Sequence, residues 1–210
     1  MSKAKHRNFF KLKADYYDDM LKGFNEYRTA AYSTGLDLLM WLSDFSIFSI
    51  MGSYDLWIVL NDYYGAQKKY QQYFYLRQAS LICFELLTDI SQHCNNNFND
   101  LLINLIVDRS INNESRRIRK SLNKVRNDNV SKFKHIRNLT IAHRDHNISQ
   151  QVEIMNNIDA DWIIEFSLNY LKLIEELHIL LNRAMNFISS DITKLGKAKF
   201  RKKYKKYELQ

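Results

Sequence analysis

The sequence contains no proline and only 5 glycines among its 210 residues. These two residue types mark most turns and interrupt helices, so their scarcity predicts long, uninterrupted helices. No stretch combines alternating apolar and polar residues with regularly spaced turn signals, which argues against a sheet. We therefore expect an all-α protein.

Cysteine is also scarce, because Cys83 and Cys94 are the only two. Both fall in one predicted helical stretch, where the helical rise separates them by roughly 16 Å and prevents a disulfide. Zinc-binding cysteine pairs, an HExxH motif and a glycine-rich phosphate loop are all missing. The signatures of serine and cysteine nucleophiles are missing too. We expect neither a metal nor another cofactor.

The chain lacks a long apolar run. Its most apolar region, 36–60, carries Asp37, Asp44 and Asp55, and each aspartate would cost about 2.5–3.5 kcal/mol near the centre of a bilayer. No charge-free run reaches the length that a spanning helix needs, and residues 1–13 are polar and basic, without the apolar core of a signal peptide. These features predict a cytoplasmic protein that does not enter a membrane.

The hydrophobic residues make up 46% of the chain, enough for a buried core. Their spacing predicts helices over 9–33, 35–51, 55–93, 98–108, 113–126, 130–143 and 149–157, with turns at Gly52-Ser53 and at Asn127-Asp128-Asn129, where Asn129 would cap the next helix. A last helix carries an apolar stripe from Ile163 to Phe187, which we assign to the core. The predicted fold is an up-and-down helical bundle over 61–190, with an N-terminal helical extension over 1–60 packed on it and a basic C-terminal tail over 191–210.

The net charge of +8 is uneven, because the basic tail over 191–210 contributes +6 and the remainder is nearly neutral. The tail includes Lys202 and Lys203, and a predicted basic helix over 113–126 contains Arg116, Arg117, Arg119 and Lys120. Clustered cations of this kind bind nucleic-acid phosphates. The alternative is that they are solvated surfaces that keep the protein in solution.

The segment from 130 to 143 contains the most informative residue, Arg137. Its apolar residues share one arc of a helix, and Arg137 falls in the middle of that arc. A charged side chain in an apolar stripe is rare unless it is paired. Arg137 therefore either neutralises a carboxylate, Glu85 or Asp89, or faces a cleft or a subunit interface.

His143 follows Arg137 by six residues, which places it about 120° further round an ideal helix. The two side chains approach each other if the helix ends or distorts before His143. Asn138, between them in sequence, offers a hydrogen-bond donor and an acceptor. His143, Asp145 and His146 also raise the alternative of a metal site, but the spacing of the usual zinc motifs is absent.

The sequence Arg137-Asn138-Leu139-Thr140-Ile141-Ala142-His143 resembles the RxxxxxH signature of the HEPN superfamily. The resemblance covers about 70–190 and leaves residues 1–60 unexplained. It implies a helical bundle that is commonly dimeric and that often acts as a metal-independent endoribonuclease in phage-defence, toxin–antitoxin or CRISPR systems. Arg137, Asn138 and His143 would then be the catalytic residues, supported by Glu85, Asp145 and His146. The expected partners are RNA, a second copy of the chain, and a cognate antitoxin or defence-system protein.

The residue types suit such a reaction. Attack of a ribose 2′-OH on the adjacent phosphate gives a 2′,3′-cyclic phosphate and a free 5′-OH. Arginine matches phosphate oxygens with a planar fork of donors, and histidine exchanges protons near neutral pH. Two other interpretations stay open: a non-catalytic helical module that binds RNA or a partner protein, and a structural protein in which Arg137 is buried against Glu85.

Overall fold

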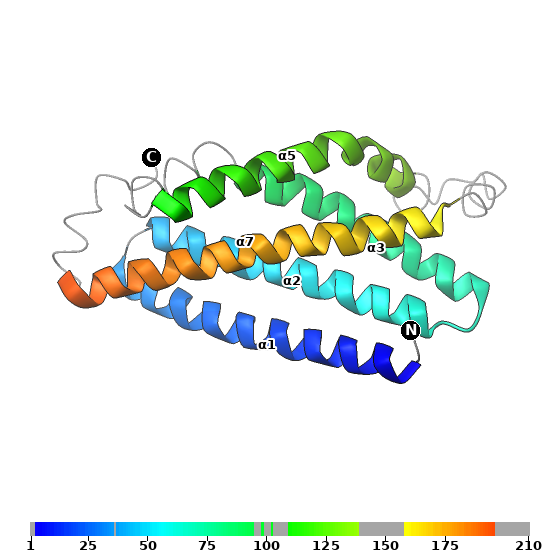
Figure 1. Ribbon diagram of the computed structural model, residues 1–210, viewed down its shortest axis with the longest axis horizontal. Coiled ribbons are helices and arrows are strands. Elements are labelled where there is room, and N and C mark those ends of the chain that lie inside the picture. The colour runs from blue at the N-terminus through cyan, green and yellow to red at the C-terminus, as the bar shows by residue number, and fades with distance from the viewer. Residues whose placement is uncertain are drawn as a thin grey trace.

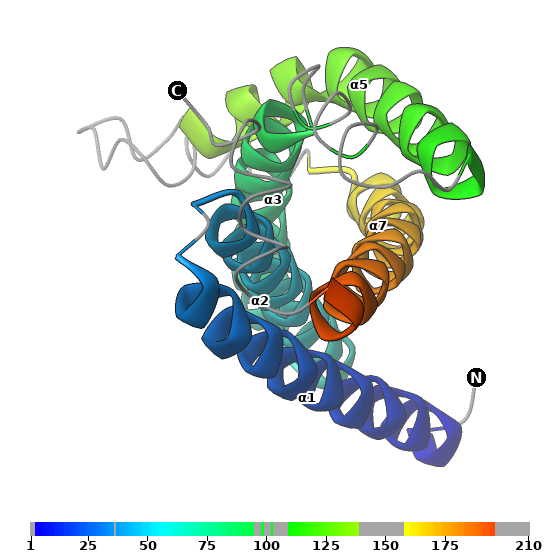
Figure 2. The same ribbon diagram turned by 90° about the vertical axis from the view of Figure 1, so that its left-hand side faces the viewer.

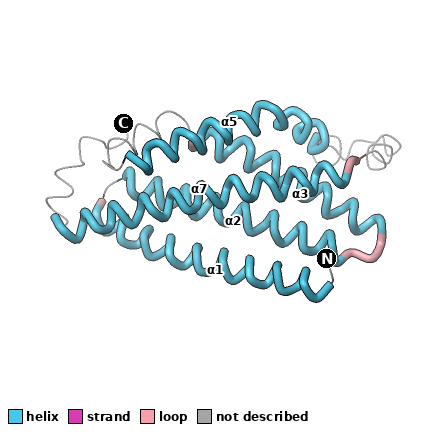
Figure 3. The backbone as a smooth tube through the Cα atoms, in the orientation of Figure 1, coloured by secondary structure: helices cyan, strands magenta, loops and turns pink. Residues whose placement is uncertain are grey.

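The computed structural model describes residues 3–35, 37–94, 98, 102, 109–138 and 158–195. These residues form the helices α1 (Lys3–Thr34), α2 (Asp37–Gly65), α3 (Lys69–His93), α5 (Arg109–Arg137) and α7 (Ala160–Leu195). The described part of the chain contains no strand (Figure 3), which confirms the predicted all-α class. None of the described helices is both long enough and apolar enough to cross a membrane.

Successive helices run in opposite directions along the long axis of the molecule (Figure 1). Seen from one end, α1, α2, α3 and α5 form a curve, and α7 lies on its concave side (Figure 2). The contacts agree, because α7 touches all of the other described helices. The predicted up-and-down bundle is therefore confirmed, with the last of the described helices at its centre.

The core is centred on the apolar stripe of α7. Ile163, Tyr170, Leu177 and Leu180 are buried there, as the sequence predicted. The side chain of Asp159 accepts a hydrogen bond from the backbone N–H of Trp162 at 3.0 Å, which caps the start of this helix. The cap fixes where the helix with the apolar stripe begins, because it satisfies a backbone N–H group that has no partner within the helix.

The predicted turn at Gly52-Ser53 is wrong, because α2 continues through both residues. A Cβ on Gly52 would lie 2.4 Å from Leu86 Cδ2, so glycine here permits close packing against α3. The buried Ser53 hydroxyl donates to the Ser49 carbonyl at 2.8 Å, as polar groups in a core must find a partner. The break comes instead after Gly65. The predicted division at residue 60 consequently falls inside a helix.

The predicted break at 127–129 is also wrong, because α5 is continuous from Arg109 to Arg137. Asn129 does not cap a helix, since its side-chain amide donates to the Val125 carbonyl one turn earlier, at 2.9 Å. Phe133 is fully buried on the same helix and fixes it to the core beyond the polar residues. Of the predicted helix 98–108, only residues 98 and 102 are described, and both are buried and helical; the predicted helix 149–157 lies outside the described residues.

Candidate functional site

The candidate site lies at the C-terminal end of α5, where Phe133 fixes the helix to α7. The Phe133 ring stacks on Trp162 with centroids 4.9 Å apart and contacts Phe166 at 4.7 Å. Arg137 follows Phe133 by one helical turn and is the last residue of α5. The packing of Phe133 therefore determines where the Arg137 guanidinium is presented.

Arg137 is half-buried, and its guanidinium carbon lies 5.1 Å from the centroid of the Phe84 ring on α3. A guanidinium over an aromatic face is attracted by the ring quadrupole, by about 0.5–1 kcal/mol at exposed sites. The guanidinium also carries five N–H donors in a planar fork. One of them, on Nη1, donates to Asn138 Oδ1 at 3.4 Å.

Asn138 lies in a wider, π-type turn directly after the α-helical part of α5. Such turns depart from the regular helical spacing and are frequent at functional sites. The side chains of Arg137 and His143 can meet only if the helix ends or distorts between them. The helix geometry changes at Asn138, the first residue after Arg137.

The predicted alternative partners of Arg137 are carboxylates on α3. Glu85 is exposed and Asp89 is half-buried. Among the residues that the structure describes, no ion pair joins Arg137 to either of them. The interpretation in which Arg137 is sealed against Glu85 therefore has no support from these contacts, and Arg137 has an aromatic neighbour instead.

The other residues of the predicted site, His143, Asp145 and His146, lie outside the described residues, as do Lys202 and Lys203 of the tail. Their positions relative to Arg137 stay predictions. The structure thus describes Arg137 and Asn138 of the motif, and it describes Glu85 on α3.

The four predicted phosphate-binding cations of α5 do not form one uniform group. Arg116 and Lys120 are exposed, and Arg119 is half-buried. Arg117 Nη2 forms an ion pair with Glu176 of α7 at 2.7 Å. Arg116 and Lys120 are therefore available to a ligand, whereas Arg117 joins α5 to α7 through its ion pair.

A cleft that the sequence did not reveal lies beside the candidate site, between α5 and α7. Its volume is about 320 Å³, and its lining residues are Val125, Asn129, Trp162, Glu165, Phe166, Asn169 and Tyr170. Trp162 and Phe166 also contact Phe133, so the cleft adjoins the turn that carries Arg137. Phe166 and Tyr170 belong to the apolar stripe of α7. The sequence could not locate the cleft, because the spacing of apolar residues does not show which of them also border a cleft.

The buried thiols do not offer a second reactive centre. Burial raises the pKa of the Cys83 thiol to about 12, against a smaller opposite effect of its contact with the Ser167 hydroxyl at 3.4 Å. Burial also raises the pKa of Cys94. Both cysteines are free, as the sequence predicted; both are also buried, and both are protonated at neutral pH. They serve the core and not a reaction.

Comparison of the chain with protein-family models, curated proteins and solved structures found no match.

Proposed function

We propose that the protein is a metal-independent endoribonuclease of the HEPN type, with Arg137, Asn138 and His143 at its active site. The observation that supports this most is the environment of Arg137. Arg137 is half-buried, its guanidinium lies over the Phe84 ring, and no ion pair links it to a described carboxylate. A partly desolvated cation of this kind gains a partner when an anionic phosphate approaches.

In the proposed reaction, the ribose 2′-oxygen attacks the adjacent phosphorus and the bond from phosphorus to the 5′-oxygen breaks. The 2′-hydroxyl loses a proton and the 5′-oxygen gains one, which leaves a 2′,3′-cyclic phosphate and a 5′-OH. Arg137 stabilises the charge on the phosphorane oxygens, and His143 transfers a proton. Asn138, already hydrogen-bonded to Arg137, orients either the guanidinium or the phosphate.

A single copy of the motif supplies one arginine and one histidine. A C2 dimer would bring two copies of the 130–146 segment together into one composite site, and C2 is the commonest symmetry of soluble assemblies. We place this dimer in the cytoplasm as a toxin or phage-defence component, with a cognate antitoxin or defence-system protein as its regulator. This biological role rests on the resemblance to HEPN domains and not on the site itself.

A second function, RNA binding without catalysis, is favoured by a separate observation. Exposed cations continue along α5 well away from Arg137, at Arg116 and Lys120. A protein that only binds RNA needs such a surface and needs no histidine. The two functions therefore differ in what they require of His143.

The test is cleavage of purified total RNA in EDTA by four variants with equal helical content in circular dichroism. Arg137→Ala and His143→Ala should each lower the cleavage rate by about 10²–10⁴-fold. Arg137→Lys should restore little, because a lysine lacks the planar fork. His135→Ala is the matched control, since His135 is exposed on the same helix and outside the motif. Full activity of His143→Ala would contradict the proposal, and correctly folded protein that cleaves no RNA would favour the binding module.

A further inference from the structure

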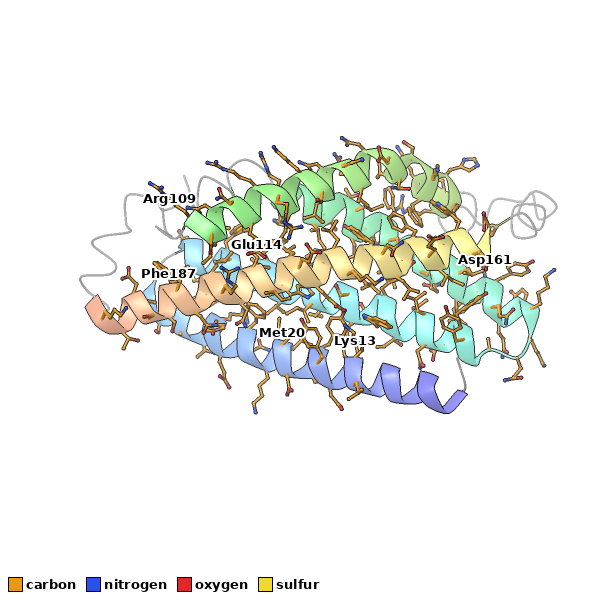
Figure 4. All side chains as sticks on the ribbon, viewed as in Figure 1. Lys13, Met20, Arg109, Glu114, Asp161 and Phe187 are labelled. Atoms are coloured by element: carbon orange, nitrogen blue, oxygen red, sulfur yellow. The ribbon has the colours of Figure 1, made fainter. Side chains whose placement is uncertain are left out.

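The helix α5 carries an unusual charge for a helix packed in a bundle. Its 29 residues include ten Lys and Arg but only two Asp and Glu. Five of these cations are exposed, lie on one side of the helix and form no ion pair with another described residue: Arg109, Arg116, Lys120, Lys124 and Lys134. Figure 4 shows nitrogen-tipped side chains projecting from α5 away from the other helices, with Arg109 labelled at its beginning.

We call the surface formed by these five cations the α5 basic face. At 100° per residue, their directions fall within about 80° of one another. The first and last of them, Arg109 and Lys134, are separated along the helix by about 38 Å, at 1.5 Å per residue. A line of cations over this distance matches an extended polyanion, because a single small anion would neutralise only a part of it.

An anionic membrane is the weaker candidate for this polyanion. Basic amphipathic helices bind membranes by burying their apolar face among the lipids. The apolar face of α5 is already occupied, since Ile111, Ile118, Leu122 and Phe133 are buried in the bundle. The surface that remains for a ligand is cationic and polar, and it suits a phosphate backbone.

The α5 basic face contains no aromatic side chain, which favours double-stranded over single-stranded RNA as its ligand. Proteins that bind single strands stack the bases on aromatic side chains. No Phe, Tyr, Trp or His lies within the arc of the five cations: Phe133 has no exposed surface, and the exposed His135 falls about 20° outside the arc. The α5 basic face therefore offers phosphate contacts without an aromatic ring on which bases would stack.

Polar side chains between the cations add a basis for preferring RNA to DNA. Asn113, Asn127 and Ser131 are exposed and fall within the same arc as the five cations. Their amides and hydroxyl both donate and accept hydrogen bonds. The ribose 2′-OH, which distinguishes RNA from DNA, needs partners of this kind beside the phosphate contacts.

We propose that the α5 basic face binds the phosphate–ribose backbone of a double-stranded segment of RNA, with the duplex lying along α5 and leading toward Arg137 at its end. The inference rests on the proposed function, because it takes RNA as the substrate and adds that the substrate is structured. It assigns α5 the role of positioning a duplex so that an adjoining nucleotide reaches the site.

The test measures binding of the full chain to a labelled RNA duplex of about 16 base pairs, to one of its strands, and to the same duplex in DNA. The triple variant Arg116→Gln, Lys120→Gln, Lys124→Gln removes three cations from the face. The control triple, Lys22→Gln, Lys69→Gln, Lys172→Gln, removes three exposed lysines from α1, α3 and α7 and has the same net charge. Both carry Arg137→Ala as well, so that bound RNA is not cut during titration.

We expect the RNA duplex to bind at least about tenfold more tightly than the single strand or the DNA duplex. The α5 triple should weaken duplex binding at least about tenfold. It should also flatten the slope of log K against log salt by about 2.7, from about 0.9 for each phosphate that the protein no longer neutralises. The control triple should keep the slope. Equal binding of the single strand, an equal loss of affinity in both triples, or displacement of the duplex by phosphatidylserine vesicles would overturn the proposal.

The outcome separates this inference from the proposed function. Duplex binding that depends on the α5 basic face, without cleavage by the wild type, would support the duplex-binding inference and contradict the proposed endoribonuclease activity. The α5 triple variant can also be made with Arg137 retained. If it cleaves RNA normally and the duplex affinity is unchanged, the endoribonuclease proposal is supported and the duplex-binding inference is contradicted.

Discussion

His178 should make the protein sensitive to mild acid. The side chain is fully buried in α7, and burial lowers its pKa from 6.5 to about 3. The positive charge of Lys13 on α1 also lowers this pKa, whereas the nearby backbone of Ser49 raises it. Neither ring nitrogen of His178 has a hydrogen-bond partner among the described residues, and burial outweighs the effect of Ser49. The imidazole is therefore neutral in the folded protein at pH values where it is charged in the unfolded chain.

The groups around His178 do not offer a buried counter-charge. Tyr17 of α1 meets the imidazole edge-on, with ring centroids 6.4 Å apart, and Tyr54 of α2 stacks on Tyr17. Glu175, one turn earlier on α7, is held in an ion pair by Lys13 at 2.5 Å. A proton on His178 would face the phenol ring of Tyr17 and the positive charge of Lys13, whose carboxylate partner is already engaged.

The sign of the effect follows from the direction of the pKa shift. Because the folded-state pKa is lowered, the unfolded chain binds a proton at His178 from about pH 6.5 downward and the folded protein does not. The stabilisation is complete above pH 6.5 and is lost progressively between 6.5 and about 3. At 1.36 kcal/mol per pKa unit, the loss is about 3 kcal/mol between pH 7 and pH 4.5, and about 4 kcal/mol by pH 3. The second value approaches the whole stability of a small domain.

The assay is urea unfolding at fixed protein concentration, followed by circular dichroism from pH 7 to pH 4.5. His178→Leu should lose about 3 kcal/mol less than the wild type over this range. At pH 7 it should match or exceed the wild type in stability, because it replaces a poorly paired polar group. His135→Leu, on the exposed face of α5, is the control and should follow the wild type. Free energies of unfolding that fall in parallel for wild type and His178→Leu would refute the reasoning.

Three further predictions concern packing, the tail and assembly. In thermal unfolding, Gly52→Ala should lower the free energy of unfolding by about 1 kcal/mol, because its Cβ would lie 2.4 Å from Leu86 Cδ2. Gly23→Ala should raise it by about 0.4–1 kcal/mol, because a Cβ there meets nothing within 4 Å. Truncation after Thr193 should weaken RNA binding and flatten its salt dependence, and an unchanged slope would reduce the tail 194–206 to a solubility device. Light scattering at micromolar concentration should give twice the 25.1 kDa of one chain, and a monomer alone would contradict the composite site.

The fold class and the core stripe could be predicted because they depend on composition and on spacing along one helix. The helix boundaries depended on contacts that spacing does not contain. Gly52 lies inside α2 because α3 approaches it closely at Leu86. Asn129 stays helical because the buried Phe133 continues α5 beyond it. In both places tertiary packing overrides the local preference for a turn.

The candidate site could be predicted in part for the same reason. An arginine in an apolar stripe indicated that Arg137 either pairs with a carboxylate or faces a cleft or a subunit interface, and it did not indicate an aromatic neighbour. The partner in the structure is the face of Phe84, which belongs to another helix. Helical periodicity identifies which face of a helix is apolar, and it cannot identify which ring of a neighbouring helix will lie opposite a given residue.

The most direct test of the proposed nuclease is the chemistry of its product ends. Wild-type protein is incubated with a structured RNA in excess EDTA, and the ends are identified by mass spectrometry. The proposed mechanism, in which the 2′-oxygen attacks with help from Arg137 and His143, predicts fragments with 2′,3′-cyclic phosphate and 5′-OH ends and a rate that EDTA does not change. Fragments with 3′-OH and 5′-phosphate ends, or loss of cleavage in EDTA, would contradict it.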